Sequence, residues 1–153
     1  MKCVILAAGQ GKRLSPYTDK KPKCMVSFLG KPILKWQTET LIRNGINDIH
    51  VIGGHHANEI NQKGIKLSIN QNYAKTNMVC SLFSNMGLFD EAIHCDEDLL
   101  ISYGDIIYQD HVIDLIKNKD SEIDVVADLN WESFWQIRMD NPLEDAETFV
   151  LGS

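Results

Sequence analysis

The chain begins with a short apolar run that stops abruptly at a glycine. Residues 2–8 are almost entirely apolar, and the polar, glycine-containing segment 9–13 follows at once. The run is too short for a membrane-spanning helix, and the residues after it do not suit a signal peptide. It therefore predicts a strand buried on both faces, and such strands lie inside sheets that helices cover on both sides.

Strand and helix patterns alternate along the rest of the chain. We expect further strands at residues 48–53, 65–69, 99–103 and 123–129. Helix patterns lie between them, opening or centred at Pro32, Asn58, Asn77 and Leu115. This alternation predicts the α/β class, with a mostly parallel sheet and helices on both faces. Ligands of such sheets bind at the carboxyl ends of the strands, so the loop after Ala8 and the Gly104-Asp105 corner should share one edge.

Three of the helix patterns carry an apolar stripe that should face the sheet. Residues three or four apart lie on the same face of a helix, which makes these stripes candidates for the core. The expected buried positions are Ile33, Leu34, Leu41 and Ile42 in the first helix, Val79, Leu82, Phe83 and Met86 after Asn77, and Val112, Leu115 and Ile116 in the last.

Charge is distributed unevenly along the sequence. The net charge is −6, yet residues 1–43 hold nine of the 15 Lys and Arg and only two of the 21 acidic residues. A basic segment on an acidic body indicates a local anionic ligand such as phosphate, although several of these lysines also suit solvated surface positions. Binding of nucleic acid usually needs a basic face across the whole domain, so neither nucleic acid nor a membrane is an expected partner.

Composition and cysteines limit the class further. A chain of 153 residues with 44% hydrophobic and 24% charged residues suits a single domain spanning residues 1–153. The four cysteines are Cys3, Cys24, Cys80 and Cys95, and they lack the CxxC spacing of zinc or redox sites. They predict reduced thiols and hence a cytoplasmic protein.

The segment after the first strand has the composition of a phosphate-binding loop. Gly9 and Gly11 let a nucleotide approach the backbone and can turn N–H groups toward phosphate oxygens, and Arg13 adds a planar, permanent charge. Leu14 stands where a dinucleotide-binding fingerprint needs its third glycine, and Arg13 stands where a Walker A loop needs Ser or Thr. By itself this GxGxR pattern also fits an ordinary strand-to-helix turn.

The pattern extends well beyond the glycines. It reads Leu6-Ala7-Ala8-Gly9-x-Gly11-x-Arg13-Leu14-x-Pro16-x-Thr18, then Pro22-Lys23, then Gly30-Lys31-Pro32. This resembles the superfamily of nucleotidyltransferases that make nucleotide-activated sugars and alcohols. The resemblance implies a three-layer, Rossmann-like fold of the nucleotide-diphospho-sugar transferase type. It assigns catalytic and triphosphate-binding roles to Arg13 and Lys23, nucleotide binding to Leu6, Ala8, Gly9, Gly11 and Gly104, and a magnesium (Mg²⁺) ligand to Asp105.

A second segment, residues 70–83, indicates the branch of the superfamily. The Gln-Pro loop common in sugar-specific members is absent. The pattern Asn70, Tyr73-Ala74, Asn77 and Ser81-Leu82 instead resembles phosphocholine cytidylyltransferases and their relatives. By this likeness Tyr73, Asn77 and Ser81 border the pocket for base and acceptor. The alternative is that Asn77 only caps a helix, Tyr73 packs, and Ser81 is a surface residue.

Other polar and aromatic residues carry weaker signals. His55-His56 suits a polar loop better than a metal site. Trp131 and Trp135 share a face if helical, which suits core packing or, less commonly, binding of a quaternary ammonium group. Arg138 is a candidate partner for an acidic group on the acceptor.

The implied reaction transfers CMP from CTP to a small phosphorylated alcohol or amine and releases pyrophosphate. Phosphocholine, phosphoethanolamine and a phosphorylated amino-acid amide all remain open as acceptors. The attacking phosphate oxygen is already anionic near neutral pH, because the second pKa of a phosphate monoester is near ~6, so we expect no general base. A sugar-1-phosphate nucleotidyltransferase and a nucleotide-binding module without turnover are the alternatives, and a homo-oligomer stays open.

The resemblance also implies a longer domain than this chain. Full members continue into a part that supplies a second acidic metal ligand and acceptor contacts, so we expect the chain to lack the C-terminal acceptor part. Its last residues, 149–153, resemble the end of a strand. A fragment, a truncated product and a module completed by another chain all fit this expectation.

Overall fold

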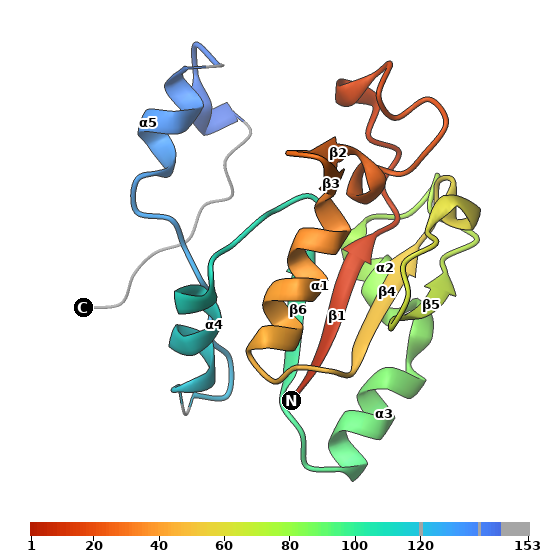
Figure 1. Cartoon of the computed structure of the whole chain (residues 1–153), viewed down its shortest axis with the longest axis vertical. Coiled ribbons are helices and arrows are strands. Elements are labelled where there is room, and N and C mark those ends of the chain that lie inside the picture. Colours follow the sequence, from red (N-terminus) through yellow and green to blue (C-terminus); the bar gives the residue numbers. More distant parts are fainter. Residues whose placement is uncertain (120, 138, 145–153) are drawn as a thin grey trace. The chain divides into compact units, whose positions relative to one another are not determined.

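The computed structural model describes residues 1–119, 121–137 and 139–144 (Figure 1). It divides into two compact units, Met1–Lys117 and Asn118–Ser153, which we treat separately. Such a division does not by itself separate domains, so a single domain over residues 1–153 stays a prediction.

The strands are β1 (Lys2–Ala7), β2 (Ser27–Phe28), β3 (Lys31–Pro32), β4 (Ile49–Gly53), β5 (Lys66–Ile69) and β6 (Leu99–Tyr103). The α-helices are α1 (Ile33–Arg43), α2 (Met78–Leu82), α3 (Gly87–His94), α4 (Asp110–Lys117) and α5 (Trp131–Gln136), and the 3₁₀ turns are η1 (Lys12–Leu14), η2 (Lys23–Met25), η3 (Ala57–Glu59), η4 (Phe83–Asn85) and η5 (Pro142–Glu144).

The first unit is built on a four-stranded parallel sheet in the order β5-β4-β1-β6. Strand β1 pairs with β4 from Cys3↔Ile49 onward and with β6 from Lys2↔Leu99 onward. The predicted parallel α/β sheet is therefore confirmed, and the carboxyl ends of β1 and β6 meet at one edge. The strand predicted at 99–103 is β6, which lies at the end of this sheet, and its residues Ile101 and Tyr103 are therefore partly exposed.

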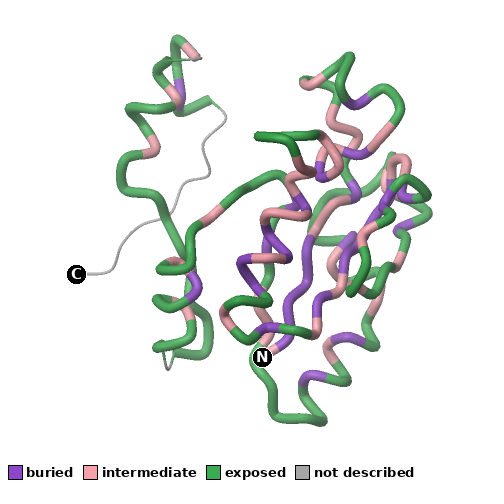
Figure 2. Tube along the Cα trace, viewed as in Figure 1, coloured by how far each residue is buried: buried purple, intermediate pink, exposed green. Residues whose placement is uncertain are grey.

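Alternation along β1 explains the three layers. Cys3 and Ile5 belong to the larger core cluster, which includes residues of α1 and α4, whereas Val4 belongs to a smaller cluster with Ile52 of β4 and Leu88 of α3. Because successive side chains of a strand point to opposite faces, one strand supplies both cores. Helices therefore cover both faces, and β1 is buried between them (Figures 1 and 2).

Helix α1 begins one residue later than predicted and buries a partly different face. Pro32 occupies its N-cap position, and the chain leaves the helix through Asn44 and Gly45, whose φ of 80° is in the left-handed region. Leu34 and Leu41 are buried as predicted, together with the polar residues Gln37, Thr38 and Thr40. Ile42 is exposed, because positions 34, 37, 38 and 41 define the inner face and residue 42 lies beside it.

The helical segment after Asn77 begins as predicted but does not continue as one helix. The Asn77 side chain accepts a hydrogen bond from the Cys80 N–H at 3.0 Å, which confirms the N-cap. The 3₁₀ turn η4 then separates α2 from α3 and shifts the buried face. Most of the predicted stripe was wrong: Val79, Phe83 and Met86 are exposed, while Ser81, Leu88 and Ala92 are buried. In α4, likewise, the buried residue is Ile113 and Leu115 is exposed.

The second unit contains α5 and the turn η5. Trp131 and Trp135 share a helical face as predicted, with their rings edge to face at 5.7 Å. The strand expected at 123–129 was wrong: the described residues there form none, and their apolar side chains are exposed. A strand needs a neighbour to pair with, and the described part of this unit contains no strand. Arg138 and residues 149–153 lie outside the described residues.

Among the described residues, no helix combines the length and the apolar character that crossing a membrane needs.

Candidate active site

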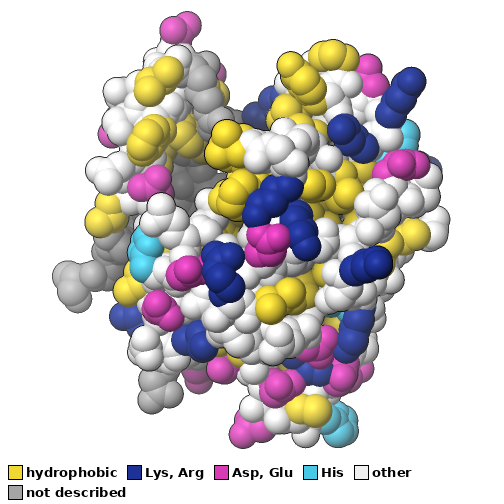
Figure 3. Space-filling view, viewed as in Figure 1, with side chains coloured by type: hydrophobic (Ala, Val, Ile, Leu, Met, Phe, Trp, Pro, Cys, Tyr) yellow, Lys and Arg dark blue, Asp and Glu magenta, His cyan; other side chains and the backbone are white. Residues whose placement is uncertain are grey.

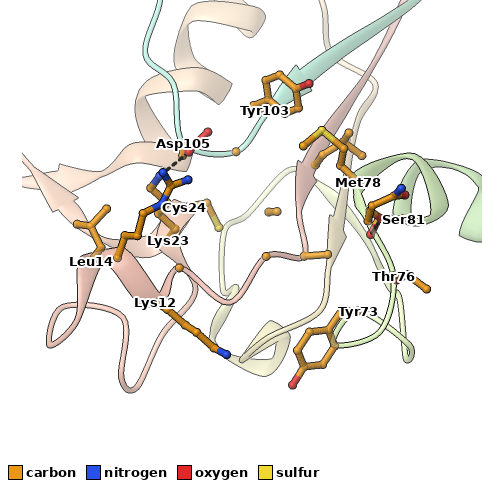
Figure 4. A pocket seen from close by; sticks show the side chains of 18 residues that line it. Lys12, Leu14, Lys23, Cys24, Tyr73, Thr76, Met78, Ser81, Tyr103 and Asp105 are labelled. Atoms are coloured by element: carbon orange, nitrogen blue, oxygen red, sulfur yellow. Dashed lines mark hydrogen bonds and ion pairs between the residues drawn. The ribbon is translucent and has the colours of Figure 1, made fainter. Parts of the chain in front are cut away.

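A cavity of about 400 Å³ opens at the carboxyl ends of β1 and β6. All the residues that the resemblance assigned to the nucleotide, metal and base pockets line it: Leu6, Ala8, Gly9, Gly11, Arg13, Lys23, Tyr73, Asn77, Ser81, Gly104 and Asp105. The loop of residues 9–13, called the glycine loop below, and Lys23 lie on one side of the cavity. Tyr73, Thr76 and Ser81 lie on the other side (Figure 4). The structure thus brings together segments that are far apart in sequence, while the role of each residue stays a prediction.

The glycine loop is closed on itself by a buried threonine. Gly11 adopts φ 64° and precedes η1, and a Cβ placed on it would lie 3.0 Å from the Thr18 side chain. The Thr18 hydroxyl donates to the Gly11 carbonyl at 2.9 Å, and Leu14 N–H donates to the same carbonyl at 2.9 Å. A loop held this way presents a fixed concave backbone rather than one that must be ordered by its ligand.

Gly104 allows the end of β6 to approach β1 closely. A Cβ at Gly104 would lie 2.9 Å from both the Ala7 Cβ and the Leu6 carbonyl oxygen, and its N–H donates to that carbonyl at 2.8 Å. On the side of α1, the buried Gln37 amide donates to the Tyr103 carbonyl at 2.6 Å. The corner that carries Asp105 is therefore fixed on both sides.

Lys23 and Asp105 meet across the mouth of the cavity. The Lys23 Nζ lies 2.5 Å from Asp105 Oδ2, and the two side chains are 35% and 38% exposed (Figure 4). Pro22 is buried, and its φ of −68° fixes the backbone just before η2, which begins at Lys23. A cation and a carboxylate that are both accessible can each change partner when an anion or a cation binds.

A cysteine lies beneath this pair without taking part in it. Cys24 lines the cavity but is almost completely buried, and burial raises the pKa of its thiol to about 12, with the negative charge of Asp105 acting in the same direction. The thiol therefore stays protonated near neutral pH and is a poor nucleophile.

The opposite wall depends on a second close approach. A Cβ at Gly54 would lie 2.6 Å from the Tyr73 Cβ and 2.7 Å from the Ala8 carbonyl oxygen. Next to it, His55 N–H donates to that carbonyl at 3.2 Å, and the His55 ring lies 5.9 Å from the Tyr73 ring. Asn77 both caps α2 and lines the cavity, and Ser81 is buried, so the surface alternative for Ser81 was wrong.

Seven of the nine basic residues of segment 1–43 fall into two groups. Several are held in ion pairs away from the cavity, namely Lys2 with Glu91, Lys31 and Lys35 with Glu39, and Arg43 with Asp110. Three others line the cavity: Lys12, Arg13 and Lys23. On the face seen in Figure 3, basic and acidic side chains accordingly lie next to one another. Three of the nine basic residues of the segment thus line the cavity, where an anionic ligand was predicted to bind.

Three residues that shape the site were not among the predicted site residues. Gly54, Gln37 and Asn70 do not stand out by chemistry, but each had a signal. Gly54 is half of a Gly-Gly pair after a strand, and Gln37 is a polar residue in the inner face of α1. Asn70 follows the last residue of β5 directly, where a chain enters a loop.

The donor set at this edge suits magnesium held largely by a ligand. Among the described residues, no group of three or more His, Cys, Asp and Glu side chains could enclose a metal ion. Mg²⁺ is commonly bound through one or two carboxylates together with substrate phosphates, and the accessible Asp105 carboxylate fits that arrangement.

A glycine-rich loop after the first strand and a carboxylate at the end of a neighbouring strand line one cavity, an arrangement typical of nucleotide-binding α/β proteins. The chain belongs to the nucleotidyl transferase family, whose sequence model matches residues 2–137.

Relatives within the family include several cytidylyltransferases. The chain is 41% identical over 156 residues to a CTP:phosphoglutamine cytidylyltransferase from Campylobacter jejuni, covering 99% of this chain and 62% of the relative. It is 40% identical over 87 residues to a choline-phosphate cytidylyltransferase from Streptococcus pneumoniae, covering 54% of this chain and 38% of the relative. The solved structure of the CTP:phosphocholine cytidylyltransferase from Streptococcus pneumoniae matches with a TM-score of 0.54 and 37% identity, over 57% of this chain and 40% of that one.

A further relative has a different acceptor class in its name. A bifunctional sugar-1-phosphate nucleotidylyltransferase/acetyltransferase from Sulfurisphaera tokodaii is 33% identical over 144 residues, which cover 92% of this chain and 34% of the relative. The chain therefore spans about 62% or less of the length of each of these three curated relatives.

Proposed function

We propose that the chain carries the nucleotide site of a cytidylyltransferase, which transfers CMP from CTP to a small phosphorylated acceptor and releases pyrophosphate. The observation that carries the proposal is the convergence of Arg13, Lys23 and Asp105 with the wall around Tyr73 in one cavity. Relatives named for CTP support the choice of nucleotide. Among the acceptors left open by the sequence, a phosphorylated amino-acid amide is favoured by the relative that aligns with 99% of the chain.

In this proposal the residues of the chain act by positioning and by charge. Arg13 and the N–H groups of the closed glycine loop hold the phosphates that leave as pyrophosphate. Lys23 exchanges its carboxylate partner for a phosphate oxygen and offsets the charge that develops during attack on the α-phosphorus. Asp105, released from Lys23, would hold Mg²⁺. When bound, this ion would stabilise negative charge on the α-phosphate.

The attacking group needs no activation by the protein. The second pKa of a phosphate monoester is near ~6, so the acceptor oxygen is anionic at neutral pH. The protonated Cys24 thiol offers no competing nucleophile at the cavity. In-line displacement by positioned reactants accounts for the chemistry without a covalent intermediate.

A nucleotide-binding module without turnover is the second candidate, because the chain spans 62% of its relative from Campylobacter jejuni. One experiment separates the candidates: the four nucleoside triphosphates, each with Mg²⁺, are tested against phosphocholine, phosphoethanolamine, phosphoglutamine and glucose 1-phosphate. Pyrophosphate release reports turnover, and the shift in melting temperature reports binding, since a ligand at 100 times its Kd stabilises the native state by about 2.7 kcal/mol. Release with CTP and a phosphorylated alcohol, amine or amide supports the proposal. Binding without release supports the module, and equal melting shifts for all four nucleotides contradict the cytidine preference.

A further inference from the structure

The loop of residues 70–77, between β5 and α2, forms much of the wall that faces the glycine loop. Tyr73, Thr76 and Asn77 all line the cavity from it, yet none of the loop residues belongs to a strand or a helix. Its first residue is tied to the sheet, because Asn70 N–H donates to the Gly53 carbonyl at 2.9 Å. Most of the loop is exposed, whereas Asn70 is only 5% exposed and does not line the cavity.

The buried side chain of Asn70 holds the loop at three points. Its Nδ2 donates to Thr76 Oγ1 at 2.9 Å and to Ser81 Oγ at 2.9 Å. Its Oδ1 accepts from the Asn72 backbone N–H at 2.9 Å. The three partners lie at the start of the loop, near its end and in the first turns of α2, so a single amide fixes the path of the whole segment.

The hydrogens of this network can be assigned, and they admit only one kind of side chain. The Thr76 hydroxyl donates to the Asn72 carbonyl at 3.0 Å, and the Ser81 hydroxyl donates to the Asn77 carbonyl at 3.1 Å. Both hydroxyls therefore accept from Asn70, and the backbone N–H of Asn72 can only donate. The position needs two N–H donors and one acceptor oxygen on a short stem. Aspartate has no donor, and glutamine is one methylene longer.

We infer that Asn70 is the positioning residue of the wall opposite the glycine loop, and that it thereby sets the nucleobase selectivity of the site. This inference rests on the proposed function. The link to the cavity is direct, because Thr76 and Ser81 bind Asn70 and also line the cavity. Tyr73, which precedes both in the chain, lies against Gly54, where there is no room for a Cβ. Binding of the triphosphate belongs to the other wall and does not involve Asn70.

The test uses Asn70→Asp, with Gln71→Glu as the matched control. Both changes replace an amide by a carboxylate in the same loop, but Gln71 is exposed and does not line the cavity. The charge-free variant Asn70→Ala is made in parallel. Calorimetry in Mg²⁺ gives the affinities for CTP, UTP and inorganic tripolyphosphate, and hydrogen exchange of the free protein gives the protection of residues 72–81.

We expect both Asn70 variants to lose on the order of tenfold or more in CTP affinity and to bring the CTP/UTP ratio close to one. Tripolyphosphate affinity should stay within about twofold for Asn70→Ala, because the glycine loop is untouched. Exchange should accelerate at residues 72–81 and stay unchanged in β1 and α1. Gln71→Glu should match the parent protein throughout.

Three results would overturn the inference. One is an unchanged CTP/UTP ratio in Asn70→Ala when the parent protein prefers CTP. Another is equal loss of CTP and tripolyphosphate affinity, which indicates general unfolding. The third is unchanged exchange at residues 72–81, which refutes the positioning role even if the parent binds no nucleotide. If the parent protein binds tripolyphosphate but does not prefer CTP, the proposed function is contradicted, and the role of Asn70 in nucleobase selectivity is contradicted with it. The hydrogen-exchange result still decides whether Asn70 positions the loop.

Discussion

Lysine–carboxylate pairs lie at both ends of the central strand β1, and they differ in exposure and in number of partners. At the carboxyl end, Lys23 has one carboxylate partner, Asp105, and both side chains are more than a third exposed. At the amino end, the Lys2 side chain is 8% exposed. Its Nζ faces three carboxylates: Glu91 at 2.7 Å, Asp48 at 3.3 Å and Glu97 at 3.6 Å.

The difference separates a pair that can exchange partners from a cluster that cannot. An accessible single pair is only weakly stabilising, so either member can turn to a ligand at little cost in stability. The Lys2 cluster instead joins β1 to α3 and to the segments before β4 and β6. The Glu91 carboxylate, above all, raises the pKa of Lys2. In the proposed function the same two functional groups therefore serve ligand binding at one end of β1 and folding at the other, and four predictions test that contrast.

The largest effect should come from Asp105→Ala. Pyrophosphate release should fall on the order of a thousandfold, because the carboxylate proposed to hold Mg²⁺ is gone, while the circular dichroism spectrum and melting temperature stay close to the parent values. Asp105→Asn keeps the shape of the corner and should lose Mg²⁺-dependent CTP binding equally. Full activity in either variant refutes the metal role, and unfolding of both favours a structural role for this corner.

Lys23→Ala should lower kcat on the order of a hundredfold with little change in CTP affinity, since its contact is proposed to strengthen in the transition state. Arg13→Ala should weaken CTP binding as well, because Arg13 is proposed to hold phosphate throughout. Calorimetry gives the affinity, and pyrophosphate release gives the rate. If Lys23→Ala retains its rate and loses only affinity, Lys23 is a binding residue.

At the other end of β1, Lys2→Met should lower the melting temperature by several degrees and leave CTP binding unchanged. The change leaves Asp48, Glu91 and Glu97 close together without their shared cation. Lys66→Met is the matched control, because Lys66 also pairs with Asp48, at 2.8 Å, but is 57% exposed and should contribute little. Equal losses for the two variants would remove the distinction between buried and accessible pairs.

The smallest effect is a dependence of stability on acid pH. Lys2 lowers the pKa of Glu91 below its usual 4.5, and Lys66, followed by Lys2, lowers the pKa of Asp48 below its usual 3.8. A carboxyl whose pKa is lowered in the native state stabilises it above the unfolded-state pKa, and this contribution disappears as pH falls through the native value. Melting temperature should therefore fall as pH drops below about 4.5, and less steeply in Lys2→Met. A parallel decline in both proteins would show that other groups govern acid unfolding.

The two ends of β1 also differ in how far the sequence could predict them. The carboxyl end could be predicted from the sequence, because glycines mark where strands stop and parallel strands bring those ends together. Gly9 and Gly104 thus indicated one shared site. The amino end could not be predicted in this way, because the partners of Lys2 come from three distant segments that no sequence pattern connects to it. Only the folded sheet brings Asp48, Glu91 and Glu97 to the same point.

The errors in the predicted helix after Asn77 and in the predicted strand at 123–129 also arise because distant parts of the chain decide the outcome. Helical periodicity located the segment after Asn77 but not its buried face, because the turn η4 changes the phase between α2 and α3. The run at 123–129 has strand composition, but strand formation depends on a partner that composition does not reveal. The positioning role of Asn70 could not be predicted from the sequence, because it depends on the hydrogen bonds that its amide makes with three separate residues in the folded chain.

The central position of β1 has a further consequence during synthesis. It leaves the ribosome well before its register partners Ile49 and Leu99, which lie much later in the chain. At translation rates of roughly 5–20 residues per second, both edges of β1 are complete only after a wait of roughly 5–20 s. During that time an apolar segment of strand character is open to association with other nascent chains. Lys2 on one side and Lys12-Arg13 on the other place positive charge at both ends of the segment, which discourages such association until the sheet closes over it.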